Sequence, residues 1–272
     1  MRTWSRILLN TTDIELWPAS LLRARSNRDA RLLARAHHVL RRKRDGRYLA
    51  VAGADGVTGL LPGWERAPGL FSALHALATH RDGGRPATRA PAALPLSQLH
   101  QRLEALDLDA DAYAADTGLP LVPEPAWLAF AGVDRYRRPL WLTPAAARAW
   151  ARMHAHALRE GVVLEAISGY RSHDYQLGIF ARKRGRGLTV AEILAVNAAP
   201  GFSEHHSGGA LDIGTPGEPP AEESFEHTPA FAWLQTHAPD HGFRMSYPRD
   251  NPHGIVYEPW HWYYLDGLED AV

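Results

Sequence analysis

A short segment near the C-terminal end of the chain combines histidine and aspartate in a way that could bind a metal ion. In SEHHSGGALD, residues 203–212, His205 and Asp212 are separated by a Ser-Gly-Gly turn. Glycine tolerates tight turns, so the chain can fold back and then enter a strand. One nitrogen donor and one oxygen donor could then converge at a single point.

A second segment, EPWHWYY at residues 258–264, places a carboxylate three positions before a histidine. Residues three apart in a regular strand face opposite sides, so Glu258 and His261 would be separated in an unbent strand. Pro259 has a fixed φ and can bend the entry to the strand. Because aromatic residues flank His261, the alternative interpretation is a histidine packed in an aromatic core.

Together the two segments contain the donors of a catalytic zinc site. A zinc ion with three protein ligands and one open position binds water and lowers its pKa to about 7. His205, Asp212 and His261 would supply these ligands. A carboxylate near the metal but not bound to it, here Glu258, can accept the proton of the water and pass it to a departing amine. The chain has no cysteine, so metal ligands must be nitrogen and oxygen atoms.

Most of the fifteen histidines are expected to be exposed or packed rather than bound to metal. A metal-binding histidine needs a carboxylate and a second histidine in compatible surroundings. The histidines on helix-like or loop segments without an acidic partner at a meaningful offset are His37, His38, His75, His80, His100, His154 and His156.

The pattern SxHxxGxxxD, followed about fifty residues later by ExWH, resembles the signature of a family of zinc peptidases. This family includes D-alanyl-D-alanine carboxypeptidases of the vancomycin-resistance type and the related L,D-carboxypeptidases. The resemblance extends to SGYRS at 168–172 and to GFRMSYP ahead of EPWHWYY, and it runs from about Leu119 to the C-terminus. Phage-type endopeptidases of the same superfamily usually have a PHF-like ending, so EPWHWYY resembles the exo-acting branch.

The resemblance also implies roles for individual residues. It makes His205 the ligand and not the adjacent His206. It places Arg171 in the active site, where a guanidinium could stabilise the carbonyl oxyanion or bind a carboxylate. Gln176 and Ser203 resemble substrate-contacting positions. The alternative interpretations are a surface arginine, a glutamine on a helix face and a serine in a turn.

By resemblance, the expected activity is removal of a C-terminal D-amino acid, D-alanine, from peptidoglycan stem peptides or muropeptides, with one Zn²⁺ per chain. The bond could be a D,D bond in a pentapeptide, an L,D bond in a tetrapeptide, or the bond of a free D-Ala-D-Ala dipeptide. Other interpretations are a peptidoglycan endopeptidase of the same superfamily and a non-catalytic, zinc-containing peptidoglycan-binding module.

The domain that carries these residues, 96–272 with a motif-bearing core at 119–272, is predicted to be α+β. A small antiparallel sheet would hold the zinc site, with helices on its flanks. Strands are expected in RRPLWL, VVLEAIS, GGALDIG, GFRMSYP and IVYEPWHWYYL. Helices are expected at 97–106, from Pro144 to Gly161, at 172–187, at 188–199 and at 230–237.

The first 95 residues are predicted to form a smaller, mixed α/β module of unknown role, and the resemblance does not extend to them. Its expected elements are a helix at Ser26–Leu40, a hairpin turn at Asp45-Gly46 with a strand at Tyr48–Ala52, a helix at Leu70–His80, and a linker rich in Gly, Pro and Arg at 81–97.

Composition limits the partners that the chain can bind. Thirty basic residues balance thirty acidic ones in 272 residues, so no overall charge attracts nucleic acid. The basic cluster at 41–44 lacks interleaved aromatic residues and is interpreted as a solvated hairpin edge rather than a nucleic-acid patch. No apolar span reaches transmembrane length, and the stretch at Ile7–Leu9 is too short for a signal-peptide core. A cytoplasmic location is therefore expected, or a periplasmic or cell-wall location if a leader was removed.

Overall fold

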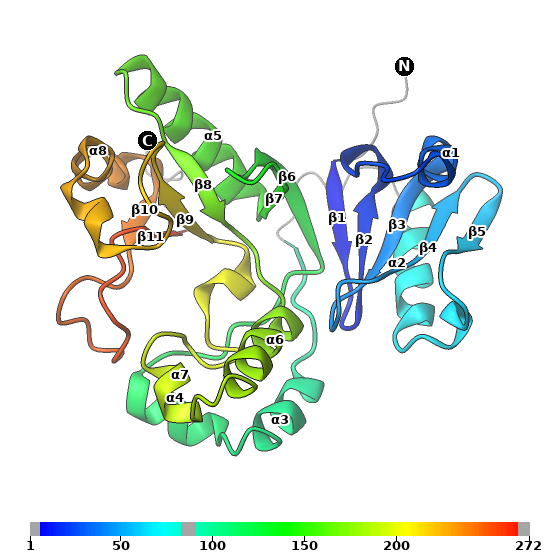
Figure 1. Ribbon diagram of the computed structural model, residues 1–272, viewed down its shortest axis with the longest axis horizontal. Helices are drawn as coiled ribbons and strands as arrows, with labels where there is room; N and C mark the ends of the chain where they lie inside the picture. Colours follow the sequence, from blue (N-terminus) through cyan, green and yellow to red (C-terminus); the bar gives the residue numbers. More distant parts are fainter. Residues whose placement is uncertain (1–5, 83–90, 266–272) are drawn as a thin grey trace. The chain divides into compact units, whose positions relative to one another are not determined.

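The computed structural model describes residues 6–82 and 91–265 (Figure 1). The chain divides into two compact units, of which unit 1 comprises Met1–Leu94 and Pro125–Phe130, and unit 2 comprises Pro95–Glu124 and Ala131–Val272. Residues 125–130, predicted to lie in the C-terminal domain, belong to unit 1. Part of the predicted linker, residues 83–90, lies outside the described residues.

Unit 1 is built on an antiparallel sheet with the strand order β5-β4-β3-β2-β1-β6. The strands are β1 (Ile7–Asn10), β2 (Ile14–Pro18), β3 (Ala36–Arg42), β4 (Tyr48–Gly53), β5 (Gly56–Gly59) and β6 (Trp127–Val133), and the chain passes from unit 1 into unit 2 within β6. The predicted hairpin between β3 and β4 is confirmed, and Gly46 in its turn has φ 69°.

The predicted helix at Ser26–Leu40 is wrong in its second half. Helix α1 covers Asn27–Arg35, with the Ser26 side chain accepting a hydrogen bond from the backbone N–H of Asp29, and the chain then continues as β3. Val39 pairs with strands on both sides in the centre of the sheet, and it is buried. This burial and pairing outweigh helix propensity, so residues 36–40, including two histidines expected on a helix or loop, form a strand.

Helix α2 (Leu70–Asp82) confirms the helix predicted at Leu70–His80 and packs on β1 and β2. Its buried Ala73 and Leu77 contact the apolar face of the sheet. The basic cluster at 41–44 is less solvated than expected, because Lys43 is buried and Arg41 forms an ion pair with Glu15 at 2.8 Å.

Unit 2 contains a four-stranded antiparallel sheet with the order β10-β11-β9-β8. Its strands are β8 (Glu165–Ser168), β9 (Ala210–Gly214), β10 (Phe243–Met245) and β11 (His261–Tyr264), while β7 (Pro139–Leu142) lies beside β6. Each of these five strands lies within a segment that was predicted to be a strand. Helices and antiparallel sheets therefore make up the domain, as expected for the α+β class.

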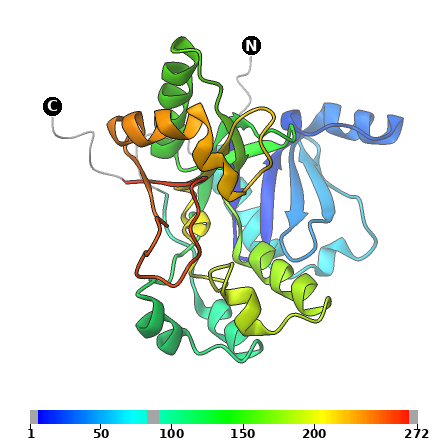
Figure 2. The same ribbon diagram turned by 60° about the vertical axis from the view of Figure 1, so that its left-hand side comes forward.

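The helices of unit 2 form two groups (Figure 1 and Figure 2). The helices are α3 (Ser97–Glu104), α4 (Ala110–Thr117), α5 (Pro144–Arg159), α6 (His173–Arg184), α7 (Val190–Leu194) and α8 (Pro229–His237). Helices α5 and α8 share one apolar core with the sheet. Residues of α3, α4 and α7 share a second core with the segments around Phe202 and Tyr247. Helix α7 is shorter than the predicted 188–199, and α4 was not predicted.

Alternation along the central strands places the candidate site between the two cores. Leu211, Ile213 and Trp262 point into the core formed with α5 and α8. Asp212 and His261 are neighbours of these residues in β9 and β11, so their side chains point to the opposite face of the sheet. The aromatic residue that follows His261 therefore packs in the core, whereas His261 faces the candidate site.

Among the described residues, no helix combines the length and apolar character that crossing a bilayer requires.

Gly201 precedes the segment that carries Ser203 and His205, and we expect its replacement by alanine to destabilise unit 2. Its φ is +91°, and an added Cβ would lie 2.4 Å from Cδ2 of the buried Leu99. Gly201→Ala should lower the free energy of unfolding by about 1–3 kcal/mol. Urea unfolding followed by circular dichroism measures this change.

Gly187 provides a matched control because its φ is +92° but no atom lies within 4 Å of an added Cβ. Gly187→Ala therefore introduces the same backbone strain without the contact. If both variants lose equal stability, the close approach of Leu99 has no energetic role.

Candidate metal centre and active site

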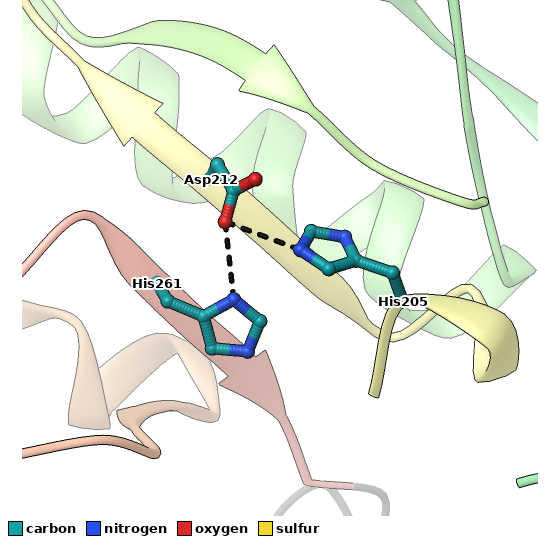
Figure 3. A group of neighbouring side chains, drawn as sticks. All are labelled: His205, Asp212 and His261. Atoms are coloured by element: carbon teal, nitrogen blue, oxygen red, sulfur yellow. Dashed lines mark hydrogen bonds and ion pairs between the residues drawn. The ribbon is translucent and has the colours of Figure 1, made fainter. Parts of the chain in front are cut away.

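Three side chains from three different elements converge on one point in unit 2 (Figure 3). His205 comes from a 3₁₀ helix at Glu204–Ser207, Asp212 from the middle of β9, and His261 from the start of β11. Oδ1 of Asp212 lies 3.2 Å from Nε2 of His205 and 3.0 Å from Nδ1 of His261. All three residues are buried. The structure thus brings together the three predicted metal ligands.

Strand register and one glycine turn produce this convergence. His261 and Asp212 are directly paired across β11 and β9. The predicted Ser-Gly-Gly turn is confirmed, because Gly208 ends the 3₁₀ helix with φ 73° and the chain then enters β9. This left-handed conformation strongly favours glycine, and it lets His205 return to a position beside Asp212.

The second nitrogen of each imidazole is held by a hydrogen-bond acceptor. Nδ1 of His205 lies 2.7 Å from the carbonyl oxygen of Gly169, and Nε2 of His261 lies 2.9 Å from Oε2 of Glu204. A nitrogen that faces a carbonyl or carboxylate oxygen must carry the proton and donate. The remaining nitrogens, Nε2 of His205 and Nδ1 of His261, both face Oδ1 of Asp212, and they are the atoms that would bind a metal ion while the second nitrogens keep their protons.

The electrostatics of this group favour a positive charge between the three side chains. Burial lowers the pKa of His205 to about 4, with Arg171 adding to the shift. Burial also acts to lower the pKa of His261, but its hydrogen bonds to Asp212 and Glu204 outweigh burial and raise the pKa to about 10. Burial would raise the pKa of Asp212, yet the two histidines lower it well below the usual range.

The donor set fits a tetrahedral metal ion. Zinc binds histidine nitrogen and carboxylate oxygen at about 2.0–2.2 Å, which separates neighbouring tetrahedral ligands by about 3.3 Å. The two contacts of Asp212 are 3.2 and 3.0 Å, and the three ligand atoms lie within 4.8 Å of one another. In residues 6–82 and 91–265, no other group of three His, Asp or Glu side chains brings its ligand atoms this close.

A small pocket of about 30 Å³ opens beside the three converging side chains. The predicted site residues that line it are Arg171, Gln176, Ser203, His205, Glu258 and His261. The remaining lining residues are Asn197, Ala198, Tyr247 and Ile255. The residues expected to contact a substrate therefore share one pocket with two of the candidate metal ligands.

Glu258 lies beside the candidate ligands but is further from His261 than Asp212 is. Its Oε2 is 3.9 Å from Nδ1 of His261, and burial raises its pKa to about 7. The backbone N–H of His261 donates to the carbonyl oxygen of Glu258 at 3.1 Å, which closes a turn over Pro259. The predicted bend is confirmed, and it brings the two side chains to the same side of the chain.

Arg171 and Gln176 contribute polar groups to the pocket wall. Nη2 of Arg171 is 4.0 Å from Oδ2 of Asp212, and its buried Nε makes no hydrogen bond. Nε2 of Gln176 donates to the carbonyl oxygen of Ala198 at 3.0 Å, while its buried Oε1 makes none. One buried N–H donor and one buried amide oxygen of pocket-lining residues thus lack a hydrogen-bond partner.

His206, the neighbour of His205, is engaged elsewhere. Its Nδ1 lies 2.7 Å from the carbonyl oxygen of Arg171, and its Nε2 accepts from the backbone N–H of Gly201 at 3.1 Å. Its ring packs edge-on against His173. Both nitrogens therefore hold the backbone of two site segments.

Three residues near the site were not predicted. Glu204 binds His261, and the buried ring of Tyr247 lies over His261 with centroids 4.9 Å apart. Glu124, also buried, accepts from the Tyr170 hydroxyl at 2.5 Å and from the backbone N–H of His173 at 2.8 Å, and so holds the SGYRS segment. Glu204 and Tyr247 lie within the motifs SEHHSGGALD and GFRMSYP, whereas Glu124 lies outside these motifs.

One of the other histidines differs from its prediction. His156 does have an acidic partner, since its Nε2 is 3.2 Å from Oε1 of Glu160, one helical turn further on. Its Nδ1 is 3.1 Å from Nε2 of His241. These side chains do not line the pocket described above.

The part of the chain that carries this site is similar to known proteins. Residues 139–267 match the family model described as VanY, D-alanyl-D-alanine carboxypeptidase. This segment, slightly less than half of the chain, is similar to the VanY family. All seven predicted site residues lie within it, namely Arg171, Gln176, Ser203, His205, Asp212, Glu258 and His261.

Individual relatives of the VanY segment match over similar lengths. YodJ of Bacillus subtilis (strain 168) is 38% identical over 125 residues, which cover 44% of this chain and 45% of YodJ. A D-alanyl-D-alanine carboxypeptidase of Enterococcus faecium is 32% identical over 137 residues, which cover 49% of this chain and 40% of that protein. The solved structure of the LdcB LD-carboxypeptidase is 35% identical in sequence, with a TM-score of 0.43. The match covers 46% of this chain and 59% of the LdcB chain. The chain thus spans less than half the length of these two curated relatives.

Proposed function

We propose that the VanY segment is a zinc-dependent carboxypeptidase that removes a C-terminal D-amino acid, D-alanine, from peptidoglycan stem peptides or muropeptides. The observation that carries this proposal is the convergence of three potential ligand atoms, from His205, Asp212 and His261, beside the partly buried carboxylate of Glu258. Similarity of residues 139–267 to the VanY family supports the choice of substrate.

Each residue has a distinct part in the proposed reaction. When bound, zinc supplies a Lewis acid that polarises the scissile carbonyl and lowers the pKa of water. Glu258 accepts the proton of the attacking water and passes it to the departing amine. Its position 3.9 Å from Nδ1 of His261 supports this part, because a base must lie close to the metal-binding atoms without taking a ligand position.

The polar wall of the pocket holds the peptide. The guanidinium of Arg171 stabilises the carbonyl oxyanion or binds the terminal carboxylate. Gln176 and Ser203 offer hydrogen bonds to the peptide backbone, and the unpaired buried Oε1 of Gln176 supports this assignment. A buried polar atom without a partner is costly, and a peptide N–H would satisfy it.

Incubation of the purified protein with defined tri-, tetra- and pentapeptide stems and with D-Ala-D-Ala, followed by mass analysis, tests the proposal. We expect loss of one terminal D-alanine from a stem peptide, abolished by a chelator and restored by zinc. Loss from the pentapeptide indicates a D,D bond, and loss from the tetrapeptide indicates an L,D bond.

Other products would contradict the proposal. Cleavage between internal residues would indicate an endopeptidase, and cleavage of the free dipeptide alone would indicate a dipeptidase. Binding of zinc and stem peptide without any hydrolysis would indicate a non-catalytic peptidoglycan-binding module.

A further inference from the structure

The imidazole of His261 is held at both of its nitrogens by carboxylates. Nδ1 faces Oδ1 of Asp212 at 3.0 Å, and Nε2 faces Oε2 of Glu204 at 2.9 Å. The two nitrogens lie on different edges of the ring, so Glu204 approaches His261 from the edge remote from Asp212. A carboxylate in this position cannot share the candidate metal with Nδ1, and it acts on the metal only through the ring.

The other candidate histidine ligand is supported differently. Nδ1 of His205 donates to the backbone carbonyl of Gly169, a neutral acceptor. Glu204 presents a charged acceptor to His261, and a charged acceptor makes a stronger hydrogen bond than a neutral one. The two histidines therefore differ in how firmly their protons and ring orientations are held. The acceptor of His261 is a side chain, so a mutation can remove it, whereas the acceptor of His205 is a backbone carbonyl.

The backbone around Glu204 is itself fixed. Its carbonyl oxygen accepts from the Ser207 hydroxyl at 2.7 Å, and the 3₁₀ helix of residues 204–207 ends at Gly208. The side chain of Glu204 is only 17% exposed. A buried carboxylate is costly unless it is hydrogen-bonded, and the ring of His261 provides that bond across 57 residues of sequence.

We propose that Glu204 is a positioning residue that holds the proton on Nε2 of His261, fixes the ring, and so strengthens binding of the metal by Nδ1. This inference rests on the proposed function of the site. Metal-binding histidines commonly donate their second N–H to a carboxylate or carbonyl, which raises the basicity of the ligand. One short helix, at Glu204–Ser207, then supplies both a ligand, His205, and the support of another.

Zinc affinity measured by chelator competition on the full chain tests this inference without reference to catalysis. Removal of an outer partner of a ligand typically weakens metal binding about 10–100-fold, and we expect this loss for Glu204→Ala. Glu204→Gln retains an oxygen that can accept from Nε2, so its loss should be smaller than that of Glu204→Ala. Glu104→Gln, at an exposed glutamate of α3, should bind zinc as the unchanged protein does.

Substitution with Co²⁺ gives a second measurement, because its visible d–d spectrum reports ligand geometry. We expect the spectrum of Glu204→Ala to change and that of Glu204→Gln to stay closer to the unchanged protein, with circular dichroism confirming that each variant is folded. Wild-type affinity and an unaltered Co²⁺ spectrum in both folded Glu204 variants would overturn the inference and leave the proposed function intact. Absence of stoichiometric zinc binding by the unchanged protein would overturn both.

Discussion

Replacement of Glu258 by glutamine is expected to lower kcat for release of terminal D-alanine about 10²–10⁴-fold, the usual contribution of a general base. Glutamine has nearly the same shape but cannot accept the proton of the attacking water. Glu258 contacts His261 at 3.9 Å without sharing the 3.0 and 3.2 Å contacts of Asp212, so zinc should remain bound at one ion per chain. Stem-peptide hydrolysis and metal analysis on the same sample measure both quantities.

The combination of lost turnover and retained zinc is what distinguishes a base from a ligand. A Glu258→Gln protein that loses zinc together with activity would show that Glu258 belongs to the metal-binding group. A protein that keeps full activity would show that another group accepts the proton, and the proposed mechanism would then be wrong.

Replacement of Asp212 by asparagine is expected to abolish both stoichiometric zinc binding and hydrolysis. Asp212 contacts both histidines, so it contributes the negative charge and the oxygen donor around which the group is built. The loss of zinc affinity should exceed the roughly 10–100-fold typical of an outer partner, because a direct ligand is altered. Zinc retained after dialysis, together with chelator competition, measures the change.

His156 supplies a matched control for this experiment. It is a partly buried histidine of α5 in the same unit, paired with Glu160, and it lies outside the pocket wall. His156→Gln should retain one zinc per chain and full hydrolysis. If the two variants lose zinc equally, the metal is not bound by the three converging side chains.

The position of the candidate site could be anticipated because its donors lie in short segments with strong local signals. The Ser-Gly-Gly turn predicts the reversal that carries the chain from His205 to Asp212, and Pro259 predicts the bend before His261. The cross-strand pairing of His261 with Asp212 was not visible in the sequence, since it depends on the register of β9 and β11. The prediction that His261 and Asp212 bind the same metal ion therefore depended on similarity to a known motif.

Supporting residues were missed because their partners are distant in sequence. Glu204 acts on a histidine 57 residues away, and Glu124 holds Tyr170 and the backbone of His173 46 and 49 residues away. Neither glutamate has a local pattern that marks its hydrogen-bond partner. Long-range hydrogen bonds of this kind follow from the fold and not from periodicity.

Errors in the secondary structure of unit 1 have the same origin. The Ala- and Arg-rich run before Val39 has good helix propensity, yet the chain becomes a strand at Ala36. Strands β2 and β4 flank this segment, and their pairing decides its conformation. In contrast, the start of α5 was predicted correctly because Pro144 is its first residue, which is a local signal.

The central claim is that His205, Asp212 and His261 bind one zinc ion, and anomalous X-ray scattering tests it most directly. Crystals of the zinc-loaded protein measured on either side of the zinc absorption edge should give one strong anomalous peak. We expect this peak at about 2.0–2.2 Å from Nε2 of His205, Oδ1 of Asp212 and Nδ1 of His261. A zinc peak bound by other residues, or none at this group, would contradict the account.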